Sequence, residues 1–234
     1  MQIAKTKYNA NKITRISRPT ISDYINKESP KIKINFLFKI CQVVDNNEFN
    51  PENVEKNIVW IGDFRSQGII NPKLPFNFNS REGARFLAAI CNDGWISDGV
   101  CYSNSEQDLR MSVTEDALSV FGGNKSAITE LVNGNDRFLR FPSIIRDVLI
   151  LITEFKGIKS ENNPAIPSLI LKEKELIHGW IEQTIADEGC VKYYPKTYRR
   201  EISWKRAFKS DLANYKLNID EAKMLDKIGI KYEL

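Results

Sequence analysis

Two similar apolar segments of this 234-residue chain each end in a carboxylate that could bind a metal ion. Asp93 ends the run in REGARFLAAICNDG, and Glu188 ends the run in KELIHGWIEQTIADEG, 95 residues further on. Both runs have the periodicity of helices, and the negative end of a helix dipole repels a carboxylate placed there. Where two such ends meet, divalent cations would offset the repulsion, and Mg²⁺ takes carboxylate and phosphate oxygens as ligands.

The elements that must position these acids are two helices, each followed by the start of a strand. Each acid precedes a Gly, a residue that adopts the left-handed conformation at a helix end without steric cost. Small residues let helices approach closely, and we expect Ala88 and Ala89 of the first run and Ala186 of the second to do so. The self-similarity of the two segments indicates a duplicated unit.

The segments FLAAICNDG (86–94) and IEQTIADEG (181–189) resemble the two signature motifs of single-chain LAGLIDADG homing endonucleases of the archaeal freestanding type. The resemblance extends to the flanking segments NPKLPFNFNS, CYSNSEQDLRMSVTEDALSVFG and KMLDKIGI. It implies an α+β fold in which a pseudo-symmetric, duplicated αββαββα domain forms a DNA-binding saddle. Repeat 1 would cover residues 80–165 and repeat 2 residues 166–234.

The resemblance also implies an activity. It predicts a monomer with internal pseudo-twofold symmetry that cleaves double-stranded DNA at specific sites, using Mg²⁺ or, in its place, Mn²⁺. The metal ligands of the family are the acids at the eighth motif position, which correspond here to Asp93 and Glu188. These two residues are therefore the candidates for metal binding and catalysis. The metal would generate a hydroxide nucleophile and stabilise the leaving 3′-oxygen.

Sites of this family also place a basic residue on a strand, where it polarises water or phosphate. The segment RREISWKRAF (199–208) alternates charged and apolar residues, as a strand with one solvated face does, and we expect Lys205 to be the catalytic residue there. The first half offers no counterpart, because VCYSNSEQDL contains no Lys or Arg. Fast, symmetric cleavage of both strands is therefore not expected. Basic residues expected to bind DNA phosphates nearby are Lys192, Arg199, Arg200 and Arg206.

Residues 10–28 (ANKITRISRPTISDYINKE) predict two short helices joined by a turn. Ser17 suits the N-cap of the second helix and Pro19 its first turn. The stretch resembles a helix-turn-helix of the phage-repressor type, which predicts a DNA-binding head over residues 1–46, with an unrelated short helical bundle as the alternative. Residues 47–79 are rich in Asn and Pro and predict a linker, with one short strand in WIGDF. Side chains of the second helix expected to contact DNA are Arg18, Thr20, Ser22 and Asn26.

The net charge of +4 is unevenly distributed along the chain. Residues 1–40 carry +7, residues 192–216 carry +6, and the remainder carries −9. Two basic segments indicate two surfaces for a polyanion. The four Cys form no CxxC pair and there is one His, which argues against zinc fingers and His-based metalloproteases. Without a signal-peptide pattern or a run long enough to span a bilayer, we expect an intracellular, cytoplasmic protein.

Several motif positions depart from the family pattern. The sixth positions, usually acidic, are Cys91 and Ala186, and polar Asn92, Gln183 and Thr184 stand where a helix contact would favour small or aliphatic residues. These departures leave two alternatives open: a DNA-binding transcriptional regulator that has lost cleavage, and an intron-RNA splicing cofactor. Three tryptophans near the motifs are expected to be core anchors rather than base-stacking groups: Trp95, Trp180 and Trp204.

Overall fold

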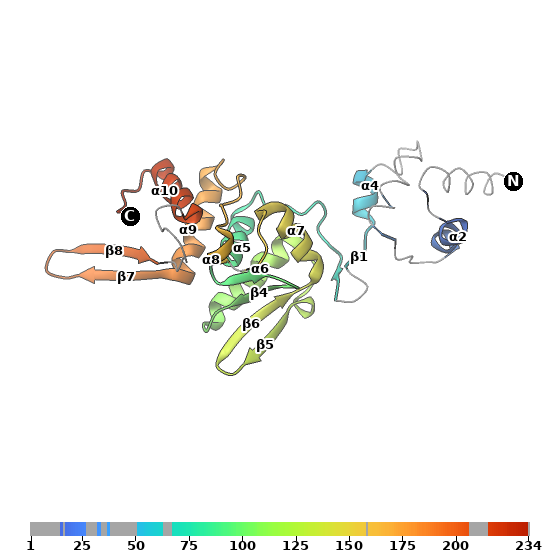
Figure 1. The fold of residues 1–234 in the computed structure, drawn as a ribbon, viewed down its shortest axis with the longest axis horizontal. Coiled ribbons are helices and arrows are strands. Elements are labelled where there is room, and N and C mark those ends of the chain that lie inside the picture. The colour runs from blue at the N-terminus through green and yellow to red at the C-terminus, as the bar shows by residue number, and fades with distance from the viewer. Residues whose placement is uncertain are drawn as a thin grey trace. The chain divides into compact units, whose positions relative to one another are not determined.

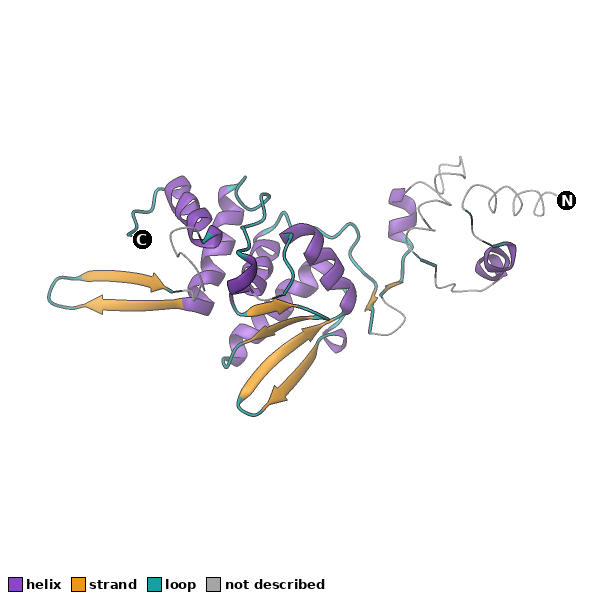
Figure 2. Ribbon diagram, in the orientation of Figure 1, coloured by secondary structure: helices purple, strands orange, loops and turns teal. Residues whose placement is uncertain are grey.

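A computed structural model describes residues 15, 17–26, 32–33, 37, 51–62, 67–157, 159–205 and 215–233. The chain divides into two compact units, Met1–Ile58 and Val59–Leu234. The predicted α+β class is confirmed, since helices alternate with small antiparallel sheets (Figure 2). Among the described residues no helix is long and apolar enough to cross a membrane.

The first unit contains α2 (Arg18–Asn26) and α4 (Pro51–Lys56). The Ser17 hydroxyl accepts the Thr20 amide at 3.3 Å, as an N-cap side chain does. Ile21 of α2 is buried. The first helix of the expected helix-turn-helix falls on residues outside the described ranges, so that motif stays a prediction.

The second unit begins with a short antiparallel hairpin in the range predicted as a linker. Its strands are β1 (Trp60–Ile61) and β2 (Ile69–Ile70), and β1 confirms the strand expected in WIGDF. Ile69 is buried in the main core. The boundary between the two units, after Ile58, therefore falls inside the predicted linker, whose last part is packed structure.

Residues 81–153 form helices and strands in the order αββαββα (Figure 1). The four strands make one antiparallel sheet in the order β3-β4-β6-β5. A short 3₁₀ helix, η2 (Lys125–Ala127), precedes the β5–β6 hairpin. The elements are α5 (Arg81–Asn92), β3 (Gly94–Ile96), β4 (Val100–Ser103), α6 (Gln107–Phe121), β5 (Thr129–Asn133), β6 (Asp136–Phe141) and α7 (Ser143–Thr153).

A connector with α8 (Lys159–Asn162) leads to a second half in which the described elements follow the order αββα. Where the resemblance implied a second four-stranded sheet, the described part of residues 166–234 contains one two-stranded hairpin. In Figure 1 this hairpin extends as an arm past the helices of its half. The elements are α9 (Lys174–Glu188), β7 (Gly189–Tyr194), β8 (Arg199–Trp204) and α10 (Lys216–Ile228).

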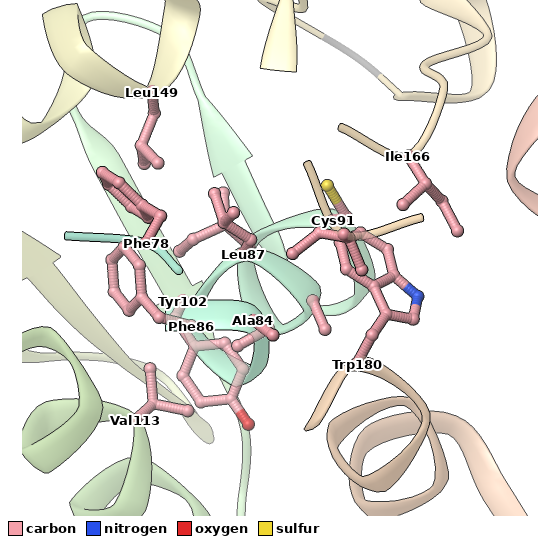
Figure 3. Packing of buried hydrophobic residues seen from close by; sticks show 14 of the residues in the cluster. Phe78, Ala84, Phe86, Leu87, Cys91, Tyr102, Val113, Leu149, Ile166 and Trp180 are labelled. Carbon is pink, nitrogen blue, oxygen red and sulfur yellow. The ribbon is translucent and has the colours of Figure 1, made fainter. Parts of the chain in front are cut away.

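One hydrophobic core spans both halves of the second unit. Helix α5 lies at its centre, where Phe86 packs edge-to-face on Phe121 and Phe141 with ring centroids 5.6 and 5.3 Å apart. Figure 3 shows Trp180 and Ile166 of the second half beside α5, on the side away from Phe86. The prediction of a core anchor is confirmed for Trp180, which has no exposed surface. Because the core is shared, the two halves fold against each other.

Helices α5 and α9 pack directly on one another. A Cβ atom at Gly179 would lie 2.7 Å from the Arg81 carbonyl oxygen and 3.2 Å from the Ala84 Cβ, so this Gly permits the close approach. Ala88 and Ala89 are fully buried, as predicted. The prediction for Ala186 is wrong, because this residue is exposed to solvent. Near the end of a helix, periodicity indicates only approximately which face a residue occupies. The small residue of α9 at the contact is Gly179.

Candidate functional site

The C-terminal ends of α5 and α9 have matching local geometry. Asp93 is the C-cap of α5, and its amide donates to the Ala89 carbonyl at 3.1 Å, while Glu188 is the last residue of α9. Both acids are partly buried. A Cβ at Gly94 would lie 2.6 Å from the Cα of Ile90, and one at Gly189 would lie 2.9 Å from the Cα of Ile185. The chain therefore leaves both helices by the same tight turn.

The predicted left-handed conformation of these two glycines is wrong. Gly189 is extended, with φ −76° and ψ 141°, and Gly94 is not among the residues with positive φ. The requirement for Gly is steric rather than torsional, because the strand starts against the last turn of its own helix. This close start places each acid directly between a helix end and a strand.

Asp187, which the sequence analysis did not identify, connects the two helix ends. One of its carboxylate oxygens accepts the Tyr102 hydroxyl at 2.7 Å and the Gln183 amide at 2.8 Å. The other accepts the Asn92 side-chain amide at 3.3 Å, across the helix contact. Helical periodicity does not show which of the adjacent acids Asp187 and Glu188 faces α5. The inward orientation of Asp187 is therefore known only from the structure.

The charges at this junction affect one another. Burial raises the pKa of Asp187 from 3.8 to about 7, and the negative charge of Asp93 adds to that increase. Hydrogen bonds from Tyr102, Gln183 and Asn92 act in the opposite direction. Burial also raises the pKa of the Tyr102 phenol, with further contributions from Asp187 and then Asp93. Asp93 and Asp187 are therefore close enough for electrostatic coupling, as expected where two helix ends carrying acids meet.

Asp93 is held by neutral donors from the end of β4. The Asn104 side-chain amide donates to its carboxylate at 3.1 Å, and the Ser103 backbone amide donates to its carbonyl at 3.2 Å. These contacts fix the side chain against the strand. They also supply hydrogen bonds without supplying positive charge.

Lys205 lies at the corresponding place in the second half. Trp204 pairs with Gly189 at the base of the β7–β8 hairpin, so Lys205, the next residue, lies beside Glu188 in the register. Its side chain is exposed. The sequence-based choice of Lys205 thus falls on the residue directly after β8, next to the strand partner of the motif Gly.

A second lysine near the helix ends was missed by the sequence reasoning. The Lys159 ammonium donates to the carbonyl oxygen of Asn92, the last residue of α5. A cation is favourable at this negative end of the helix dipole. Lys159 and Asn92 are 67 residues apart in the chain. Neither helical nor strand periodicity relates positions so distant, so no sequence signal could have found the pair.

The β7–β8 hairpin carries the predicted phosphate-binding residues on exposed strands. Because paired residues of an antiparallel hairpin share a face, Lys192 and Arg199 lie on one face and Arg200 lies on the other, with Trp204. The guanidinium of Arg199 lies 5.8 Å from the ring centroid of Tyr194 on the same face. Trp204 donates to Glu221 of α10 at 3.0 Å, so its face is the one turned to the helices. At the base of the hairpin the Lys192 face is therefore the open one, whereas further out the Trp204 face is exposed as well.

The remaining predicted DNA contacts have different outcomes. Arg18, Thr20, Ser22 and Asn26 all lie on α2, where the Asn26 amide donates to the Ser22 hydroxyl at 3.3 Å and Asn26 is exposed. Arg206 lies outside the described residues.

The donor set at the helix ends fits a hard divalent cation. Asp93 and Glu188 offer only oxygen atoms, and Mg²⁺ usually takes one or two carboxylates, together with water and phosphate. In the described ranges no three side chains of His, Cys, Asp or Glu form a group that could hold a metal by themselves. A metal at this place would therefore depend on oxygen ligands from a bound nucleic acid and water.

No protein-family model matches the chain, and a search of curated proteins also found no match.

Proposed function

We propose that the chain is a LAGLIDADG-type endonuclease that acts as a monomer and hydrolyses phosphodiester bonds of double-stranded DNA at specific sites with Mg²⁺. One observation carries the proposal: the C-terminal ends of α5 and α9 meet, since Asn92, the last residue of α5, donates to Asp187 of α9 at 3.3 Å. Acids concentrated there, next to a basic hairpin, suit the binding of metal and phosphate together.

The element order supports the proposal of a duplicated fold. Residues 81–153 run αββαββα, and the described elements of residues 174–228 run αββα. Both segments start with a helix, a tight Gly turn and a hairpin. A saddle for DNA would then consist of the open face of the four-stranded sheet and the open face of the β7–β8 hairpin. The second half would contact a shorter stretch of DNA than the first, because it has two described strands rather than four.

The residues present divide the proposed work between them. Asp93 and Glu188 would hold the metal, which when bound supplies an activated water and stabilises the leaving oxygen. Asp187 would position α9 rather than bind the metal, because its oxygens already accept three hydrogen bonds, two of which tie α9 to α5 and β4. Lys205 would contact the attacked phosphate or the water. Lys192 and Arg199 would bind flanking phosphates from the open face of the hairpin.

The test is cleavage of a randomised duplex library by the purified chain in Mg²⁺, beside Asp93→Asn and Glu188→Gln variants. We expect cuts by the wild type that vanish in EDTA and fall by at least about 100-fold in each variant. Asp136→Asn, which changes an exposed acid at the start of β6, is the matched control and should cut normally. Equal cutting by all variants, or no cutting in Mg²⁺ or Mn²⁺, would refute the catalytic proposal.

A second candidate, a DNA-binding regulator without cleavage, is favoured by one observation. The acids at the helix ends already have neutral partners: Asn104 for Asp93, and Tyr102, Gln183 and Asn92 for Asp187. A junction satisfied in this way can persist without a cation. Sequence-specific, salt-dependent binding that is unchanged in EDTA, with no cut in either metal, would identify this function.

A further inference from the structure

The β7–β8 hairpin exposes a concentration of apolar and aromatic side chains. The described part of the chain exposes twelve large apolar side chains, and five of them lie within Val191–Ile202. Single exposed apolar residues are ordinary, but five on one two-stranded arm indicate a surface that a partner covers. The five, which are 42–82% exposed, are Val191, Tyr193, Tyr194, Tyr198 and Ile202.

The same arm is basic. Residues 189–204 contain four exposed cations and one acid, a net charge of +3. The acid, Glu201, pairs with Arg199 at 3.1 Å. A partner that combines negative charge with flat apolar surfaces is nucleic acid, in which phosphates flank stacked bases. The four cations are Lys192, Lys196, Arg199 and Arg200.

Two of the three exposed tyrosines already have a cation beside the ring. Arg199 lies 5.8 Å from the ring centroid of Tyr194 on one face of the arm. Arg200 lies 6.0 Å from that of Tyr193 on the other face. The third ring, that of Tyr198, is the most exposed of the five apolar side chains, at 82%. Tyr198 is therefore the ring most accessible to a partner.

Tyr198 occupies the tip of the arm, the end that extends past the helices in Figure 1. The turn at this tip is closed by the Thr197 amide, which donates to the Tyr194 carbonyl at 3.2 Å. Tyr198 follows with φ 52°, in the left-handed region where Gly or Asn is the usual residue. A bulky side chain is disfavoured there. The turn itself therefore gives no reason for a Tyr at this position, whereas contact between its ring and a partner does.

We propose that Tyr198 is a wedge that enters duplex DNA from the minor groove, separates two stacked base pairs and bends the duplex. This inference rests on the DNA binding of the proposed function, not on cleavage, and adds DNA bending to it. Side chains inserted in this way partly unstack a base step and kink the duplex by about 20–90°. The minor groove, about 6 Å wide, admits one ring but not the arm, whose two strands lie about 4.8 Å apart before their side chains are counted. Lys196 and Arg199, which flank the ring in the chain, bind adjacent phosphates.

The experiment measures the bend in duplex DNA that the full chain selects from a randomised library in EDTA, where no metal-dependent cut is made. Circularly permuted fragments of the selected duplex give the bend angle on native gels. The base analogue 2-aminopurine, placed at successive positions, reports unstacking by an increase in fluorescence. We expect a bend of about 20–90° and one unstacked step.

The outcomes separate this inference from the proposed function. Binding of the duplex without a bend or an unstacked step would overturn the inference and leave cleavage intact. A bend without any cut in Mg²⁺ or Mn²⁺ would support the inference and refute the catalytic proposal. No binding to duplex DNA would overturn both.

Variants at the tip test the assignment to Tyr198. Tyr198→Gly and Tyr198→Asn remove the ring and suit the left-handed conformation, so both should fold, as melting curves can check. We expect both to lose the bend and the 2-aminopurine signal, whereas Tyr198→Phe, which keeps the ring, should retain them. Leu151→Ala, which truncates an 80% exposed side chain on α7, is the control and should bend DNA normally. A folded Tyr198→Gly or Tyr198→Asn protein that bends DNA like the wild type would overturn the assignment.

Discussion

Replacing the buried carboxylate of Asp187 should remove a specific pH dependence of stability. Burial, followed by the charge of Asp93, raises the pKa of Asp187 from 3.8 to about 7. Since the folded state binds this proton more tightly than the unfolded state, the stabilisation is fully present below pH 3.8 and is lost as pH rises to about 7. At about 1.4 kcal/mol per pH unit, the whole contribution is ~4 kcal/mol.

The measurement is the free energy of unfolding in urea at pH 5 and at pH 8. Between these values the proton of Asp187 accounts for a loss of about 3 kcal/mol in the wild type. Asp187→Asn cannot ionise and should lack that loss. All four tryptophans, Trp60, Trp95, Trp180 and Trp204, lie in the second unit, so their fluorescence follows this unit alone.

A matched control separates Asp187 from the other titrating groups. Asp136→Asn removes an exposed acid of the β5–β6 hairpin and should keep the pH dependence of the wild type. Parallel pH dependence in Asp187→Asn and the wild type, within about 0.5 kcal/mol, would refute the reasoning. Carboxyl NMR of the wild type gives an independent check, because the Asp187 signal should titrate near pH 7.

Three further outcomes follow from the described contacts. Asp116 is 1% exposed and pairs with Arg85 at 2.5 Å. Asp116→Ala should lower the free energy of unfolding in urea by about 3 kcal/mol, because it leaves the Arg85 charge without this partner. Adding Arg85→Met should recover part of that loss. Glu221 accepts hydrogen bonds from the Trp180 and Trp204 indoles. Glu221→Gln should therefore lower the free energy of unfolding in urea by about 1–3 kcal/mol. Lys192→Ala and Arg199→Ala should each reduce the slope of log affinity for duplex DNA against log salt by about 1.

The helices of the second unit were predictable from their sequence. The apolar runs before Asp93 and Glu188 have a helical period, and α5 and α9 end at these residues or beside them. The alternation in 199–204 likewise predicts β8. These features depend on neighbours three or four positions away, or on alternating positions, and such short-range patterns are visible in a single sequence.

The chemistry between the helices was only partly predictable. Asp187 and Glu188 are adjacent, and small changes in helix rotation decide which carboxylate turns towards α5. Lys159 reaches α5 from a connector, and Lys205 comes to lie beside Glu188 only through strand register. Contacts of this kind depend on tertiary packing, which a single sequence does not encode in any local period.

The shared core also has a consequence for synthesis on the ribosome. The partner of α5 emerges late, since α9 starts about 90 residues further along, which corresponds to roughly 5–20 s of translation. During that interval the side of α5 that will meet Gly179 and Trp180 is uncovered, even if the four-stranded sheet has already formed on its other side. A nascent chain stalled in the connector would therefore expose an apolar helix face, and rapid elongation through residues 154–188 would protect the protein from aggregation.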